Sequence, residues 1–346
     1  MSAPPLSRRE LLWALAAGAL SGPALRGQSA DAQELGSLQD PPDQGVAWVC
    51  PMHPSYTSST AGTCPICGMT LIQTRPYDTR NYGLRFRTEP AAVTAGEKVT
   101  LLFTFLHPAT GAVIKDFEVV HTKLFHLFVI SRDLEYFAHI HPTLGEDGTW
   151  AIETSLPKAG YYEVLCDFMP KGGPAQFLTA PLVTAGYGGD LATDRARLTS
   201  DTVLRKSADS ITATLTFDPP RPTSGQYVHL NLFLSDARTG QAITDLQTYL
   251  GQFSHMLLMS EDMKRYVHSH PINLIVEQED AAAPEYIIAP DADLESLRGG
   301  PKVTFDALMP EAGPFRAWVQ FQRHDRVSTI VFTFTVAQGS AVPVLA

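Results

Sequence analysis

The chain has 346 residues, 44% of them hydrophobic, and 36 acidic against 26 basic side chains give it a formal charge of −10 at pH 7. This length exceeds a typical single domain, and the apolar content allows sizeable cores. The acidic balance argues against nucleic acid as a partner, because binding nucleic acid needs a basic footprint. The 26 prolines and 25 glycines favour strands and turns over long helices.

Residues 1–32 are predicted to be an export signal. Arg8 and Arg9 precede an apolar run over 11–20, and Ala-Asp-Ala at 30–32 fits an A-x-A cleavage site. The paired arginines resemble a twin-arginine export signal. The apolar run is shorter than the roughly 20 residues that span a bilayer. The sequence therefore predicts an exported protein, periplasmic or on the cell surface, with no transmembrane span beyond the signal.

After a predicted tether at 33–46, a motif rich in cysteine occupies 47–75. Residues 50–53 read Cys-Pro-Met-His and residues 64–67 read Cys-Pro-Ile-Cys. Two turns with this spacing can converge on three sulfurs and one nitrogen, a tetrahedral set that suits Zn²⁺ and is compatible with Cu(I). We expect one metal ion to be bound by three thiols and one imidazole: Cys50, His53, Cys64 and Cys67. Two methionines of the motif are further candidate donors, Met52 and Met69.

A disulfide from Cys50 to Cys64 or Cys67 is the structural alternative, but it would place no demand on His53 or on Gly68. The segments 48–54 and 62–71 resemble the heavy-metal-binding domain with the pattern CPMHP…PGxCPxCGMxL. That domain is found at the N-termini of periplasmic efflux adaptors and copper-transporting P-type ATPases. One departure is Ala61, where the family usually has proline. The resemblance covers about residues 47–73 and implies binding of a soft metal ion, copper foremost, without implying an enzyme.

The remainder of the chain is a tandem repeat. A shift of 129 positions aligns 96–142 with 225–271 without a gap, and after an insertion at about 272–300 the alignment resumes at 156–162 and 309–315. A duplicated domain is the simplest explanation of this pattern. The predicted boundaries are repeat 1 at 84–186, a linker at 187–208 and repeat 2 at 209–338.

Each repeat has the sequence pattern of strands. Segments 99–105 and 227–234 alternate or run apolar at strand length, and turn residues separate such segments at intervals of roughly 8–12 residues. A Pro-x-Ala-Gly turn before an aromatic strand is typical of the late strands of an immunoglobulin-type sandwich. We expect an all-β fold, a small metal-knuckle module followed by two tandem immunoglobulin-like β-sandwich domains.

Three histidines recur at equivalent positions in both repeats. Segments 125–130 and 135–140 are strand-like, and a four-residue turn between them would place His126 opposite His139, with His141 on the same face. Imidazoles on opposite residues, with Cβ atoms about 5 Å apart, are close enough to share an ion. The sequence predicts two candidate copper or zinc sites. Their ligands are His126, His139 and His141 in repeat 1, and His255, His268 and His270 in repeat 2.

Structural roles for these histidines, as strand caps or loop partners, are the alternative, because duplication copies structural residues too. Cys166 or Met169 offers repeat 1 a fourth soft ligand that the aligned Val319 and Gln322 cannot replace. For the methionines of the second repeat, core packing is favoured over copper binding: Met256, Met259 and Met263.

We expect the chain to be an exported, non-enzymatic protein that binds, buffers, sequesters or relays a soft cation, copper before zinc, in the cell envelope. A metal-efflux or metal-relay envelope protein is the expected partner. One alternative is a zinc-stabilised scaffold whose sandwiches recognise another envelope protein. An efflux-system accessory protein and a copper oxidoreductase are two more. Against an efflux adaptor, this sequence shows no pattern of a long helical hairpin. Against a copper oxidoreductase, it has no Cys-His-Met cluster in one short stretch.

Overall fold

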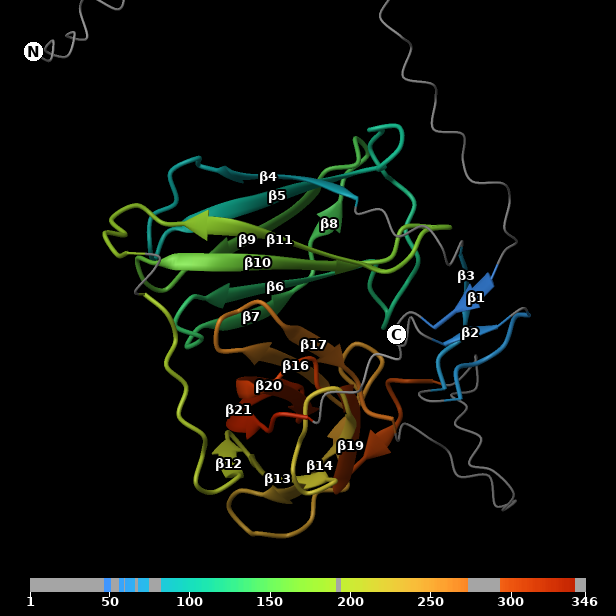
Figure 1. Ribbon diagram of the computed structural model, residues 1–346, viewed down its shortest axis with the longest axis vertical. Coiled ribbons are helices and arrows are strands. Elements are labelled where there is room, and N and C mark those ends of the chain that lie inside the picture. The colour runs from blue at the N-terminus through green and yellow to red at the C-terminus, as the bar shows by residue number, and fades with distance from the viewer. Residues whose placement is uncertain are drawn as a thin grey trace, which may run out of the picture. The chain divides into compact units, whose positions relative to one another are not determined.

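The computed structural model describes residues 47–50, 56–58, 60–65, 68–74, 82–190, 194–272 and 293–339. Every regular element in these ranges is a strand, which confirms the all-β class (Figure 1). No helix in the described part of the chain is long and apolar enough to cross a membrane. The metal module is a small antiparallel sheet in the order β2-β1-β3, formed by β1 (Ala47–Val49), β2 (Thr57–Ser58) and β3 (Ile72–Thr74).

Repeat 1 is a sandwich of two four-stranded sheets. The first has the order β4-β5-β9-β8, with β4 (Gly83–Glu89), β5 (Lys98–Leu106), β9 (Trp150–Ser155) and β8 (Thr143–Leu144). The second has the order β11-β10-β6-β7, with β11 (Gln176–Val183), β10 (Tyr161–Phe168), β6 (Phe125–Ser131) and β7 (Phe137–Ile140). This is the strand order of an immunoglobulin-like domain.

Among the described residues, repeat 2 forms the same pairs except for a counterpart of β8–β9, and it adds β12, β15 and β18. Its first sheet has the order β12-β13-β14-β19, with β12 (Arg205–Ala208), β13 (Ile211–Asp218), β14 (Tyr227–Asp236) and β19 (Lys302–Leu308). The second has the order β17-β16-β20-β15-β18, with β21 beside β20: β17 (Tyr266–Ser269), β16 (His255–Ser260), β20 (Gly313–Arg323), β15 (Leu246–Gln247), β18 (Arg298–Gly299) and β21 (Arg326–Val336). The last four residues of the predicted linker therefore belong to a strand, because β12 pairs with β13.

Each sandwich encloses its own apolar core. In repeat 1 the rings of Phe105 and Phe168 stack with centroids 3.8 Å apart. The Tyr162 hydroxyl donates to the Lys158 carbonyl at 2.8 Å. A tyrosine at the start of this strand that bonds back to the preceding corner is a mark of immunoglobulin-like domains. Phe315, which lacks a hydroxyl, occupies the equivalent position of repeat 2.

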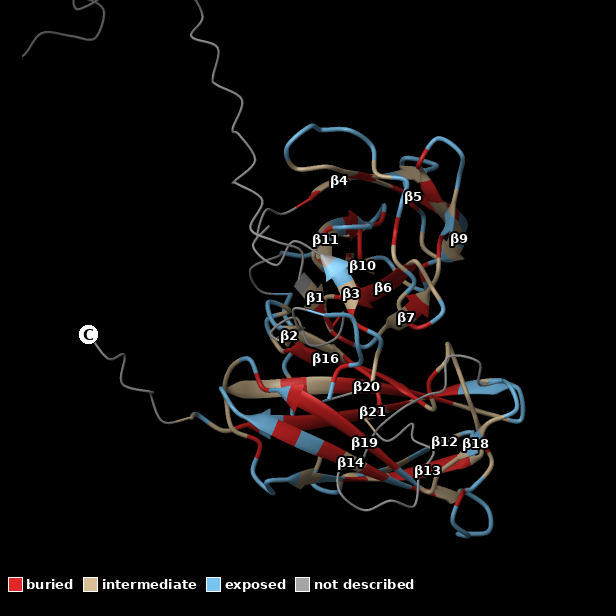
Figure 2. Ribbon diagram, turned by 90° about the vertical axis from the view of Figure 1, so that its right-hand side faces the viewer, coloured by how far each residue is buried: buried red, intermediate tan, exposed pale blue. Residues whose placement is uncertain are grey.

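A third apolar cluster lies between the two repeats. Strands β6 and β16 are buried along their whole length (Figure 2). One face of β6 lines the core of repeat 1. The other face, through Phe128 and Ile130, packs with Leu257 and Trp318 of repeat 2. The repeats are therefore joined through the sheets that carry the repeated histidines.

The methionines of repeat 2 pack as apolar side chains, as expected. Met256 is part of the core of repeat 2 and Met259 of the cluster between the repeats. Met263 lies against that same cluster.

Candidate metal centre

Strand alternation places the first histidine on the face between the repeats. Side chains at i and i+2 share a face, so His126 lies with Phe128 and Ile130 rather than with the core residues between them. In the antiparallel pairing of β6 with β7, Phe128 of β6 lies opposite His139 of β7, rather than opposite Ala138 or Ile140. The expected pairing of His126 with His139 is therefore wrong by two residues.

The register differs because the four-residue turn begins one residue later than expected, at 132 rather than 131. Ser131 donates its backbone N–H to the Tyr136 carbonyl at 3.1 Å, and Leu134 has a left-handed φ of 60°. Repeat 2 shows the same shift, since Leu257 is opposite His268. A shift of one residue would send the histidines to opposite faces, whereas a shift of two leaves the face unchanged.

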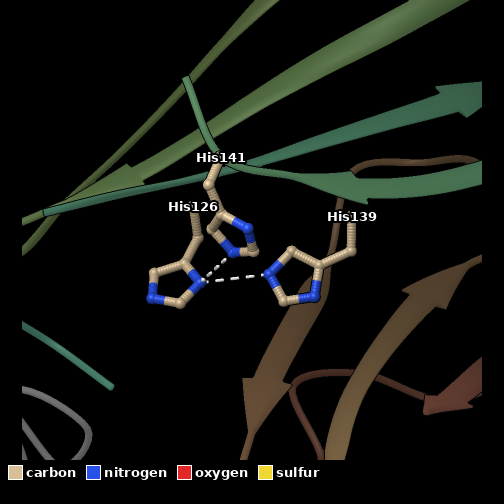
Figure 3. Close-up of side chains that lie close together, drawn as sticks. All are labelled: His126, His139 and His141. Atoms are coloured by element: carbon tan, nitrogen blue, oxygen red, sulfur yellow. Dashed lines mark hydrogen bonds between the residues drawn. The ribbon is translucent and has the colours of Figure 1, made fainter. Parts of the chain in front are cut away.

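The three imidazoles of repeat 1 converge on one point (Figure 3). Nδ1 of His126 lies 3.0 Å from Nε2 of His139 and 3.2 Å from Nε2 of His141. We call these three residues triad 1. Nitrogens bound to one tetrahedral ion at about 2.05 Å lie roughly 3.3 Å from one another. The spacing in triad 1 is therefore close to that of a metal site.

Hydrogen bonds on the outer side of two of these rings fix where their protons are. Nε2–H of His126 donates to the Val120 carbonyl at 2.9 Å, and Nδ1–H of His139 donates to Oε1 of Gln320 at 2.8 Å. The amide orientation of Gln320 is held by its Nε2, which donates to Thr329 at 3.4 Å. A neutral imidazole carries one proton, so the nitrogens of His126 and His139 that face each other both hold lone pairs. Two lone pairs cannot hydrogen-bond, but a metal ion can accept both.

Repeat 2 builds the same arrangement from His255, His268 and His270, here called triad 2. Ligand atoms of these three residues lie within 4.8 Å of one another. Nε2–H of His255 donates to the Tyr249 carbonyl at 2.7 Å, the counterpart of the bond to Val120. This leaves Nδ1 of His255 as a buried lone pair with no hydrogen-bond partner among the described residues.

His268 follows His139 in the same way. Its Nδ1–H donates to Oδ2 of Asp167 at 2.6 Å, which leaves Nε2 buried and without a hydrogen-bond partner in the described part of the chain. A buried polar atom left unpaired is costly. In both triads the first histidine thus offers Nδ1 and the second offers Nε2.

Burial keeps five of the six imidazoles neutral. It lowers the pKa of His126 from 6.5 to about 4, and the pKa of His141 to about 3, with the neighbouring imidazoles acting in the same direction. It also places the pKa values of His139, His255 and His270 well below 6.5. Neutral imidazole is the form that binds a metal ion. The donor set of each triad therefore fits copper or zinc, with one tetrahedral position left open.

One buried histidine escaped the sequence analysis. His121 of repeat 1 stacks on His270 of repeat 2 with ring centroids 3.5 Å apart, and Gln252 lies within 3.2 Å of its Nδ1. It occupies a tight turn with φ of 48°, and the aligned Leu250 has the same conformation, with φ of 53°. The repeat could not reveal His121, because its counterpart is not a histidine.

One of the two candidate fourth ligands of repeat 1 faces the core of that repeat. Cys166 is part of the core of repeat 1, so alternation along β10 turns it away from the face that carries Asp167. Burial raises the pKa of its thiol well above 9.0, so the thiol stays protonated. Met169 is buried one residue beyond β10. Cys166 therefore acts as a packing residue rather than as a ligand of triad 1.

Only part of the small module lies within the described residues. Cys50 and Cys64 are both buried, beside Leu71 and Met69. Gly68 donates its N–H to the Cys64 carbonyl at 2.7 Å, and its φ of 73° is the left-handed conformation that glycine adopts without strain. The predicted ligands His53 and Cys67, and the candidate donor Met52, fall outside the described residues.

Two family models match the chain. Residues 47–74 match the model described as heavy metal binding domain, which confirms the resemblance found in the motif. Residues 79–184 and 206–338 match the model described as domain of unknown function (DUF8832). No curated protein matches the chain.

The chain also matches several solved structures. The Escherichia coli adhesin FdeC is 15% identical over 75% of this chain and 66% of its own, with a TM-score of 0.23. Yersinia pseudotuberculosis InvD is 14% identical over 76% of this chain and 60% of its own, with a TM-score of 0.22. The chain thus spans less than two thirds of the length of either structure. The two DUF8832 stretches together cover more than half of the chain, which therefore belongs to the family described as domain of unknown function (DUF8832) and carries a heavy metal binding domain at residues 47–74.

Proposed function

We propose that this protein is exported and binds a soft metal ion, copper foremost, which it buffers, sequesters or relays in the cell envelope. The observation that carries the proposal is the pair of facing lone-pair nitrogens in triad 1, 3.0 Å apart and held in that state by Val120 and Gln320. Without a cation between them, two such nitrogens at this distance repel each other. The heavy metal binding domain supplies independent support.

The choice of copper follows from the donors. Three thiolates and two nearby methionines in the small module favour Cu(I), whereas imidazole suits both copper and zinc. A structural zinc ion in the small module is the competing assignment, so the metal must be identified by competition. Export rests on the paired arginines, the apolar run and the A-x-A site of residues 1–32. A metal-efflux or metal-relay protein of the envelope is the partner that this role requires.

The proposal assigns binding and no catalysis. Triad 1 and triad 2 combine imidazoles with groups that orient them. None of these described residues is a nucleophile beside a general base. A protein that buffers or relays an ion needs buried, neutral donors, which burial at this interface supplies.

Metal content tests the proposal. The exported protein would be purified, incubated with equimolar copper and zinc, desalted and analysed by mass spectrometry for bound metal. We expect retained copper, and a loss of at least one ion per chain in His139→Ala with His141→Ala. The exposed His229, on β14, gives the matched control His229→Ala, which should retain the full complement. A wild-type protein that retains neither metal would refute the proposal.

A further inference from the structure

The two triads form a single cluster of rings. Within triad 1 the rings of His126 and His139 have centroids 5.3 Å apart, and within triad 2 those of His255 and His268 are 6.3 Å apart. Between the triads, His126 lies 5.5 Å from His268, and His139 lies 5.6 Å from His255. The other centroid distances within the triads are 4.4–5.0 Å, so rings of different triads lie nearly as close together as rings of the same triad.

Each triad is also oriented by the opposite repeat. His139 of repeat 1 donates to Gln320 of repeat 2, and His268 of repeat 2 donates to Asp167 of repeat 1. In the strand ladders, Asp167 is opposite His126 and Gln320 is opposite His255. Each orienting residue therefore accepts a hydrogen bond from a histidine of one triad and is paired, in its own sheet, with a histidine of the other triad.

From this crosswise geometry we propose that the two triads constitute one two-metal centre that spans the repeat interface, and that its two sites differ in affinity. This inference rests on the proposed function, since it assumes that the imidazoles bind a metal ion. Sites with two ions bound a few ångströms apart are a known arrangement in proteins. Neither site is complete without both repeats, because each takes three ligands from one repeat and an orienting group from the other.

The inequality of the sites follows from the two orienting groups. Asp167 offers His268 a carboxylate, which makes the imidazole a stronger donor to a metal ion, whereas Gln320 offers His139 a neutral amide. The site of triad 2 should therefore fill first. Replacing an outer-shell partner of this kind typically costs 10–100-fold in metal affinity.

Electron paramagnetic resonance of the Cu(II)-loaded protein tests the shared centre. The full chain would carry Cys50→Ser, Cys64→Ser and Cys67→Ser, so that the small module neither binds nor reduces copper. We expect two Cu(II) ions per chain, with the loss of signal intensity or the half-field transition that mark a magnetically coupled pair. His139→Ala with His141→Ala should leave one ion with an ordinary, uncoupled spectrum.

Each other outcome is decisive. Two uncoupled Cu(II) signals, or a total of only one Cu(II) ion per chain that mutation of either triad abolishes, would overturn the two-metal centre and leave metal binding intact. A chain without these cysteines that takes up no copper, while the wild type does, would overturn the centre and restrict the proposed function to the small module. A wild-type chain that takes up no metal at all would refute the proposed function itself.

The difference in affinity is tested by stepwise copper titration of the same protein. Asp167→Asn keeps the shape of the side chain and should weaken the tighter step 10–100-fold, while the weaker step stays the same. The reciprocal change Gln320→Glu should strengthen the weaker step. Equal effects of Asp167→Asn on both steps, or on neither, would contradict the assigned order.

Discussion

His268 and Asp167 belong to different repeats and are joined by a hydrogen bond of 2.6 Å from Nδ1–H to the carboxylate. The side chain of His268 is only 8% exposed, so its ring is held between the two sheets. A ligand candidate of repeat 2 is thus fixed in place by repeat 1. On the proposed function, uptake of metal by triad 2 and contact between the repeats would be linked equilibria.

Metal binding should stabilise the protein. A ligand present at 100 times its Kd and bound only to the folded state adds about 2.7 kcal/mol per site to the free energy of unfolding. Copper or zinc should raise the Tm of the chain that lacks the cysteines of the small module, as measured by differential scanning fluorimetry. The shift should shrink when His139 and His141 are replaced by alanine. An unchanged Tm in saturating metal would contradict the linkage.

The metal-free protein should lose stability in mild acid. Burial lowers the pKa of His126 to about 4, although Asp167 and Val120 oppose this shift. A lowered pKa means that the stability is fully present above pH 6.5 and is lost as pH falls towards 4. For His126 alone the loss is on the order of 3 kcal/mol. Urea unfolding at pH 7.5, 5.5 and 4.5 measures it, and His126→Gln should flatten the dependence. Equal midpoints at pH 7.5 and 4.5 would argue against buried neutral histidines.

Trp318→Ala should destabilise the joined repeats. Trp318 is 1% exposed, and its ring stacks on Phe137 of repeat 1 at 5.0 Å. Replacement of a buried tryptophan by alanine typically costs about 3–5 kcal/mol. Urea denaturation gives the value. Phe233→Ala is the control, because Phe233 is 47% exposed, and it should change stability by about 0.5 kcal/mol or less. Similar losses in both variants would show that the interface adds little.

Cys64→Ser with Cys67→Ser should remove one metal ion per chain, because it removes two thiols of the small module. Mass spectrometry of the native protein counts the ions directly. Cys166→Ala is the matched control and should leave the count unchanged, since Cys166 faces the core of repeat 1. A full complement in the double variant would refute the ligand set Cys50, His53, Cys64 and Cys67.

Replacement of Arg8 and Arg9 by lysine should retain the protein in the cytoplasm if export follows the twin-arginine route. Fractionation of cells and immunoblotting measure the distribution. Continued export of the variant would indicate the general secretory route instead, and cytoplasmic wild-type protein would refute export altogether.

The sequence predicted the sandwiches and the shared face of the histidines because both follow from short-range patterns. Strand alternation places His126, His139 and His141 on one face for the expected register and for any register that differs from it by an even number of residues. The residue at which the hairpin turn begins could not be read from the sequence: the turn occupies 132–135 rather than 131–134, with Leu134 in the left-handed conformation. The register was therefore wrong by two, an even number that did no harm.

The contact between the repeats could not be predicted. An apolar run such as Phe125–Ile130 is equally consistent with a strand buried inside one sandwich and with a strand that also faces a second domain. The orienting roles of Asp167 and Gln320 could not be predicted either. The two residues are aligned but differ in type, and each accepts a hydrogen bond from a histidine of the other repeat. His121 was hidden for the same reason, because its partner His270 lies in the other half of the chain.

The crosswise bonds, from His139 to Gln320 and from His268 to Asp167, are what a two-fold axis generates in a homodimer, where the same patch of each subunit meets the other. A single ancestral repeat would have met its own copy in this way, with identical groups at both positions. Within one chain that constraint is absent, so that one half can carry a carboxylate at Asp167 while the other carries an amide at Gln320. A single repeat expressed alone is accordingly expected to pair with itself, and a monomeric repeat would contradict this origin.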